Sequence, residues 1–244
     1  MKNWGRFFSL GILLHLALFF LLGNSPSLGY SLPNSVSFPP ARSHPLPLSL
    51  EQWQNPTGDY FDRIEPTPLG YLVWSDFPVK IYLEPGDRST DQKWSKAIRD
   101  AIAQWSVYLP LQEVTEQENA DIIWWRSRPP TRAQIDRENR QLIIPRARNA
   151  EAKYAFYLRS QTPPILAHRF SILLSPDQNA IHTLGTARHE LGHALGIWGH
   201  SPLETDALYE AQTSNPPPIS PRDVNTLKKI YEQPTQLGWE IADS

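Results

Sequence analysis

The sequence has no cysteine among its 244 residues, and its single methionine is Met1. The lack of cysteine excludes disulfide bonds, thiolate metal ligands and a cysteine nucleophile. Any metal site must therefore be built from histidine and carboxylate side chains. The formal net charge is only −2, from 23 basic and 25 acidic residues, which excludes a chain-wide electrostatic attraction to nucleic acid or to an anionic membrane.

Aromatic residues and prolines, in contrast, are abundant. The chain contains 9 Trp, 9 Tyr and 9 Phe, and 40% of its residues are hydrophobic, a content too high for a disordered chain. A chain of this length can bury one well-formed hydrophobic core and still carry appendages. The 24 prolines are more than a single domain usually contains, so we expect them to concentrate in linkers and loops.

The amino-terminal residues are typical of an export leader. Lys2 and Arg6 precede an apolar run over residues 7–22. This pattern predicts either a signal peptide over residues 1–29, cut before Tyr30, or an uncleaved membrane anchor. In both cases the positive end stays in the cytoplasm. We therefore expect the rest of the chain to be secreted or membrane-anchored, facing the extracellular or periplasmic side.

The remaining chain divides by composition. Residues 30–58 are rich in proline and serine and predict an extended linker, followed by a packed domain over residues 59–233 and a tail over residues 234–244. Residues 126–169 carry ten basic and three acidic residues, a net charge of +7. Nucleic-acid binding is one interpretation of this cluster, but the charges lack interleaved stacking aromatics. We expect a solvated, partly stranded insertion that binds no nucleic acid.

Several regular elements are predicted inside the domain. Clusters of β-branched and aromatic residues predict strands over residues 70–83, 120–125 and 169–174. Apolar residues recur at helical spacing after residue 89 and stop before Pro110, which predicts the clearest helix of the chain. 

The most informative stretch, residues 183–209, contains His189, Glu190 and His193 in the pattern His-Glu-x-x-His. The surrounding apolar residues keep helical spacing. Two side chains four positions apart share one helix face, about 6 Å apart along the axis, so both imidazoles can reach one metal ion. Glu190 projects toward the same region, where a carboxylate serves as a base rather than a ligand. The alternative is an ordinary helix with two partly buried histidines.

Two residues after this pattern favour a metal site. Gly196 can take the left-handed conformation that ends a helix and turns the chain back, and His200 then supplies a third imidazole. Three neutral histidine ligands leave one coordination position of Zn²⁺ open, as in catalytic zinc sites. Zinc acidifies a water in that position and polarises a substrate carbonyl, while a neighbouring carboxylate transfers protons. This combination is best suited to hydrolysis of a peptide bond.

The string HELGHALGIWGHS resembles the zinc-binding motif of the metzincin metallopeptidases and most resembles that of the matrixin family. The likeness includes the helix AIRDAIAQWS and a closing helix over residues 220–231. It implies an α+β fold, with a twisted mixed β-sheet, an active-site helix and a C-terminal helix. It implies that Glu190 is the catalytic base and acid. The zinc ligands that it implies are His189, His193 and His200.

The sequence departs from the family pattern at two positions. Gly199 is an added residue before the third histidine, and we expect the turn to absorb it through a backbone conformation unfavourable for other residues. Leu208 stands where the family has the methionine of its Met-turn and is a volume-conserving apolar replacement. By the same resemblance Asp223 supports this turn. Its alternative role is the acidic position of a capping box that begins at Ser220.

These patterns predict an exported zinc-dependent endopeptidase that acts as a monomer on protein or peptide substrates. The alternative is a non-catalytic, envelope-associated domain that binds zinc or peptides on the same scaffold, but Glu190 argues against it because such a site needs no base. No acidic loop pattern supports a structural calcium ion, and nothing supports a second zinc ion. In the absence of a cysteine, any latency would have to come from residues 30–69 lying over the cleft.

Overall fold

The computed structural model describes residues 38–131, 134–136, 141–143 and 148–241. All of these described residues belong to one unit of mutually contacting elements. The predicted leader over residues 1–29 lies outside the described residues. Within the described ranges, no helix has both the length and the apolar character needed to cross a membrane.

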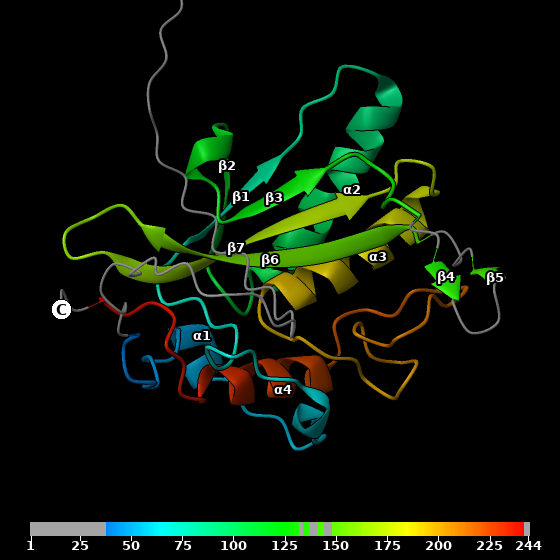
Figure 1. The fold of residues 1–244 in the computed structure, drawn as a ribbon. Coiled ribbons are helices and arrows are strands. Elements are labelled where there is room, and N and C mark those ends of the chain that lie inside the picture. The colour runs from blue at the N-terminus through cyan, green and yellow to red at the C-terminus, as the bar shows by residue number, and fades with distance from the viewer. Residues whose placement is uncertain (1–37, 132–133, 137–140, 144–147, 242–244) are drawn as a thin grey trace, which may run out of the picture. The chain divides into compact units, whose positions relative to one another are not determined.

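A mixed five-stranded sheet in the order β2-β1-β3-β7-β6 forms the centre of this unit (Figure 1). Its strands are β1 (Val79–Leu83), β2 (Leu111–Val114), β3 (Ile122–Trp125), β6 (Ala150–Arg159) and β7 (Ile165–Leu174). Parallel pairing joins β2 to β1, β1 to β3 and β3 to β7, whereas β6 is antiparallel to β7. A separate two-stranded antiparallel sheet consists of β4 (Gln134–Asp136) and β5 (Gln141–Ile143).

The helices form two groups (Figure 1). The longer pair, α2 (Ser89–Trp105) and α3 (Ala180–Ala194), lies against one face of the sheet, and the two helices pack on each other. The other pair, α1 (Leu48–Glu51) and α4 (Pro221–Tyr231), lies beyond α3, away from the sheet. Two short 3-10 helices are η1 (Phe61–Arg63) and η2 (Gln117–Asn119). This mixed architecture of sheet and helices is compatible with the predicted α+β class.

The core lies between the sheet and the long helices. Along β1 the alternate residues Val79, Ile81 and Leu83 are buried, because successive side chains of a strand point to opposite faces. The predicted apolar positions of α2 are also buried, which confirms the helical spacing read from the sequence. Trp94 and Trp105 of α2 donate their indole N–H groups to the carbonyl oxygens of β7 and α3, at 3.2 and 3.0 Å.

The predicted strands are found with altered bounds, and the central sheet contains two further strands. The strand expected over residues 70–83 is confined to β1, while those expected at 120–125 and 169–174 correspond to β3 and β7. The additional strands are β2 and β6. Residues 150–159 and 165–169 of the expected basic insertion form β6 and the start of β7, so these residues belong to the central sheet.

The described parts of the predicted linker and of the predicted tail contact the domain. His44 lies 2.8 Å from the Leu237 carbonyl oxygen, Leu50 is fully buried, and Trp53 donates to Asn225 of α4 at 2.8 Å. Apolar and aromatic side chains in both segments provide these contacts. The proline-rich stretch therefore packs against α4 and the carboxyl-terminal residues in the region that the structure describes.

Candidate metal centre

His189 and His193 lie one turn apart on the same face of α3. Their Nε2 atoms are 3.0 Å apart, and their ring planes are nearly perpendicular. The helix begins after Asn179, whose side chain accepts the backbone N–H of His182. The sequence therefore places the two imidazoles side by side through helix geometry alone.

Gly196 ends α3, as predicted. Its φ of 126° lies in the region that favours glycine. The Gly196 N–H donates to the His193 carbonyl at 3.1 Å, and the Ile197 N–H donates to the Gly192 carbonyl at 3.0 Å. These two hydrogen bonds are the pattern of a Schellman motif, which satisfies carbonyl groups at the end of a helix. The chain then turns back and brings His200 to the face of α3 that carries the other histidines.

His200 completes a cluster of three. One ring nitrogen from each of His189, His193 and His200 lies within 4.8 Å of the others, close enough to hold a metal ion. The ring centroid of His200 is 5.3 Å from that of His189 and 4.9 Å from that of His193. The described residues therefore place the third imidazole where the motif spacing predicted it.

Two other side chains near the motif, which could have replaced His200, are engaged elsewhere. His182 is half-buried, and its Nδ1 atom lies 3.0 Å from the Asn179 side-chain oxygen. Asp206 accepts hydrogen bonds from the Ser201 hydroxyl and from Arg222, the latter at 3.0 Å. Neither side chain belongs to the histidine cluster.

The hydrogen bonds of two histidines define their tautomers. The Nδ1 atom of His189 lies 2.9 Å from the Ala207 carbonyl oxygen, and that of His193 lies 2.7 Å from the Ile197 carbonyl oxygen. A carbonyl oxygen only accepts, so each Nδ1 carries the proton and each Nε2 presents a lone pair. Two lone pairs facing each other repel unless a cation lies between them. Two nitrogens on a tetrahedral zinc ion would be about 3.3 Å apart, so the observed spacing fits the ion.

Burial keeps these imidazoles neutral. It lowers the pKa of His189 to about 4 and lowers the pKa of His193 well below the ordinary value of histidine. Burial also lowers the pKa of His200, although a nearby acidic residue opposes the change. Metal ions bind unprotonated imidazole. At neutral pH all three side chains are therefore in the form that a metal requires.

Glu190 is a buried carboxyl group beside the first histidine. Burial raises its pKa to about 7, and a hydrogen bond from the Ala152 backbone N–H on β6 opposes the rise. The group therefore lies near the midpoint of its titration at neutral pH in the absence of a cation. A cation held by the histidines would favour the carboxylate and lower this pKa.

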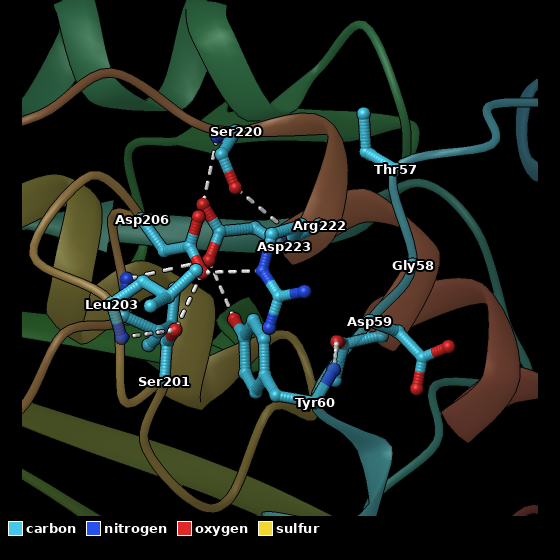
Figure 2. Close-up of polar contacts among 12 residues, drawn as sticks. Thr57, Gly58, Asp59, Tyr60, Ser201, Leu203, Asp206, Ser220, Arg222 and Asp223 are labelled. Atoms are coloured by element: carbon cyan, nitrogen blue, oxygen red, sulfur yellow. Dashed lines mark hydrogen bonds and ion pairs between the residues drawn. The ribbon is translucent and has the colours of Figure 1, made fainter.

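A short turn supports the cluster from beneath. Asp223 of α4 accepts hydrogen bonds from the backbone N–H groups of Ala207, at 2.9 Å, and Leu208, at 3.4 Å. It also forms a reciprocal capping box with Ser220, so one carboxylate performs both of the roles considered for it (Figure 2). Leu208 is fully buried and packs against α3 at Gly192. An apolar side chain therefore lies against the helix that carries His189 and His193, and its role as a floor under the three imidazoles stays a prediction.

The structure corrects the expected role of Gly199. Its φ lies outside the left-handed region, so backbone conformation does not require glycine there. A Cβ atom at this position would lie 2.2 Å from the Arg63 carbonyl oxygen, so the close approach of another segment requires it. Ile64 pairs with Gly199 in an isolated antiparallel bridge, and the Glu65 N–H donates to the Trp198 carbonyl at 3.1 Å. Sequence reasoning missed this contact, which joins backbone atoms and leaves no residue pattern.

A scan against protein-family models finds no match for this chain, and a search of curated proteins finds none either. The likeness to metzincins therefore depends on the sequence comparison alone, chiefly on the residues of the motif. The described residues establish three histidines, neutral at pH 7 and close enough to hold one metal ion, next to a buried carboxyl group.

Proposed function

We propose that this protein is a zinc-dependent endopeptidase of the metzincin type, similar to the matrixins. The observation that carries the proposal is the convergence of three neutral imidazoles on one point beside Glu190. Zinc would be held by His189, His193 and His200, and it would supply polarisation of a substrate carbonyl and acidification of water. Nitrogen ligands without carboxylates disfavour calcium, which prefers oxygen.

Glu190 performs the proton transfers in this proposal. A base works best when its pKa lies near the working pH, and burial brings Glu190 toward that range. Its carboxylate takes a proton from the attacking water and later passes it to the nitrogen of the leaving amine. The Ala152 N–H holds one side of the carboxyl group, which orients it for both steps.

The sheet offers a place for an extended substrate. Among the described strands, β6 pairs with β7 on one side and with nothing on the other, so it is an edge strand. An extended peptide can add to such an edge through backbone hydrogen bonds. The contact of Ala152 with Glu190 puts the carboxyl group beside this edge, which favours a polypeptide substrate over a small molecule.

The proposed location follows from the leader. Lys2 and Arg6 before the apolar run over residues 7–22 favour export, with the metal centre secreted or tethered outside the cytoplasm. We also propose that the protein works as a monomer.

Metal analysis combined with a cleavage assay tests this function. We expect the purified full chain to contain about one zinc ion and to cleave an unfolded protein such as casein, with loss of activity on chelation and recovery with zinc. His193→Ala should lose both zinc and cleavage, whereas His182→Ala, at a histidine outside the cluster, should retain both. Zinc binding without cleavage would leave a non-catalytic binding domain, and the absence of zinc would refute the proposal.

A further inference from the structure

Residues 59–65, here named the amino-terminal strap, contact the metal centre at two places. The first is the turn that carries His200. Ile64 pairs with Gly199, the Glu65 N–H donates to the Trp198 carbonyl at 3.1 Å, and the Arg63 carbonyl lies against the Gly199 Cα. Ile64 is buried, whereas the Glu65 side chain is exposed. The contact is therefore made mainly by backbone atoms.

The second place is Asp223 of α4, which Tyr60 of the strap contacts (Figure 2). The Tyr60 hydroxyl donates to Asp223 at 2.5 Å, and the Tyr60 backbone N–H donates to the Thr226 side chain at 3.0 Å. The same Asp223 carboxylate accepts the Ala207 N–H, and the Ala207 carbonyl orients His189. Tyr60 and Asp223 are both buried, so these hydrogen bonds are shielded from water.

The turn itself has little internal support. Within it, the Trp198 N–H donates to the Gly196 carbonyl and the Gly199 N–H donates to the Ile197 carbonyl, at 2.8 and 3.1 Å. Both bonds close over only two residues, unlike the longer bonds that hold the other two histidines on α3. The position of His200 therefore requires contacts from outside the turn, and the strap provides a backbone pairing at the residue directly before it.

We infer that the strap is a positioning element for the third metal ligand, holding residues 197–199 where His200 can join the histidines of α3. The inference deepens the proposed function and rests on it in one respect, that the three histidines bind zinc. The strap does not touch the metal position in this account. It acts through the turn, so its loss should weaken metal binding by the amount typical of an outer hydrogen-bonding partner, about 10–100-fold.

Glu65→Pro tests the inference, with Glu65→Ala as its matched control. Proline removes the backbone N–H that the Trp198 carbonyl accepts, whereas alanine keeps it and removes only an exposed side chain. Ile64 has φ −93° and ψ 125°, which a residue before proline adopts readily. The measurements on the full chain are the zinc dissociation constant, by competition with a chromogenic chelator, and the visible spectrum of the Co²⁺-loaded protein, which reports the ligand set.

We expect Glu65→Pro to weaken zinc binding at least about tenfold and to change the Co²⁺ spectrum, and Glu65→Ala to match the parent chain. In a His200→Ala background the proline substitution should have no further effect on zinc affinity, because the ligand through which it acts is gone. Equal affinity of the Pro and Ala variants would overturn the inference. An equal loss in both backgrounds would also overturn it, because the effect would then not pass through His200.

Gly199→Ala provides a second route if Glu65→Pro fails to fold by circular dichroism. The added Cβ atom would lie 2.2 Å from the Arg63 carbonyl oxygen. This substitution therefore pushes the strap and the turn apart through a change in the turn, whereas Glu65→Pro changes the strap. We expect the same loss of zinc affinity in the parent chain and none in the His200→Ala background, and any other pattern would overturn the inference. A parent chain that binds no zinc would refute both proposals, whereas one that binds zinc without cleaving peptides would refute only the peptidase.

Discussion

Glu190 separates metal binding from turnover in the proposed mechanism. Glutamine keeps its shape but cannot take a proton, so we expect Glu190→Gln to reduce cleavage by about 10²–10⁴-fold. Zinc content should stay near that of the parent chain, because Glu190 is not among the clustered ligands. Glu204→Gln, at an exposed carboxylate after His200, is the control and should leave both values unchanged. Comparable turnover in Glu190→Gln would remove the residue from the mechanism.

Leu208 is buried against α3 at Gly192, the residue before His193, so we expect apolar and charged substitutions of it to differ in their effects. We expect Leu208→Met to change the free energy of unfolding by less than about 1.5 kcal/mol and to retain zinc, because the volume is conserved. Leu208→Asp places an unpaired carboxylate at a fully buried position. It should lower the free energy of unfolding by several kcal/mol and abolish zinc binding. Urea unfolding and metal analysis measure both effects. A well-folded, zinc-loaded Leu208→Asp protein would contradict the assigned role.

At the scale of elements, several parts of the chain meet at the metal centre. Helix α3 provides two histidines, β6 provides the N–H that orients Glu190, and α4 provides the carboxylate of Asp223. The strap adds the backbone pairing at Gly199. His189 and His193 lie on α3 and His200 lies on the turn that follows it, whereas β6, α4 and the strap contribute no histidine to the cluster and fix the positions of the neighbouring groups.

The end of α3 at Gly196 determines where the chain turns back and therefore where His200 lies. Gly196→Ala would place a Cβ 2.5 Å from the Leu72 carbonyl oxygen, at a φ of 126°. We expect a loss of about 1–3 kcal/mol in the free energy of unfolding and weaker zinc binding, because Ile197 orients His193. Urea unfolding and chelator competition measure these quantities.

Gly58→Ala is the matched control for this substitution. Gly58 also has a positive φ, of 79°, but it is exposed, and an added Cβ would meet only the Arg222 side chain at 3.5 Å. It should lose stability through backbone conformation alone and keep the zinc affinity of the parent chain. Equal zinc affinities in the Gly196→Ala and Gly58→Ala proteins would show that the helix end does not influence the site.

At the scale of the whole molecule, buried histidines couple stability to pH. Burial lowers the pKa of His168 to about 3, and its ring stacks on Trp74 at 3.9 Å. In the unfolded chain the pKa is about 6.5, so between these values the unfolded chain binds a proton that the folded chain does not. The contribution of His168 to the free energy of unfolding is therefore fully present above about pH 6.5 and is lost as the pH decreases toward 3.

His168→Phe isolates this contribution because phenylalanine keeps the aromatic contact and cannot titrate. We expect the free energy of unfolding of the zinc-free chain to depend less steeply on pH between 6 and 4.5, by up to about 1.4 kcal/mol per pH unit. Urea unfolding at a series of pH values gives this slope. The zinc-free state is required because metal binding adds its own proton linkage. An unchanged slope would show that His168 does not contribute.

The sequence by itself determined the features that depend on neighbouring residues. The spacing of His189 and His193 places them on one helix face, Gly196 ends that helix, and Ser220 with Asp223 caps α4. Each of these follows from helix geometry or from hydrogen bonds that span only a few residues. The convergence of His200 was also predictable, because only a short turn separates it from the helix.

Only the tertiary structure decided the remainder. Strand β6 lies in a segment with many charged residues, so its half-buried and exposed positions do not alternate clearly between apolar and polar residue types. The segment is a strand because it pairs with β7. The strap and Gly199 meet through backbone atoms, and Tyr60 reaches Asp223 from far along the chain. Such contacts form because packing of the whole core brings distant segments together. The pairing requires a residue without a Cβ atom at position 199, but that glycine does not indicate in the sequence which segment lies against it.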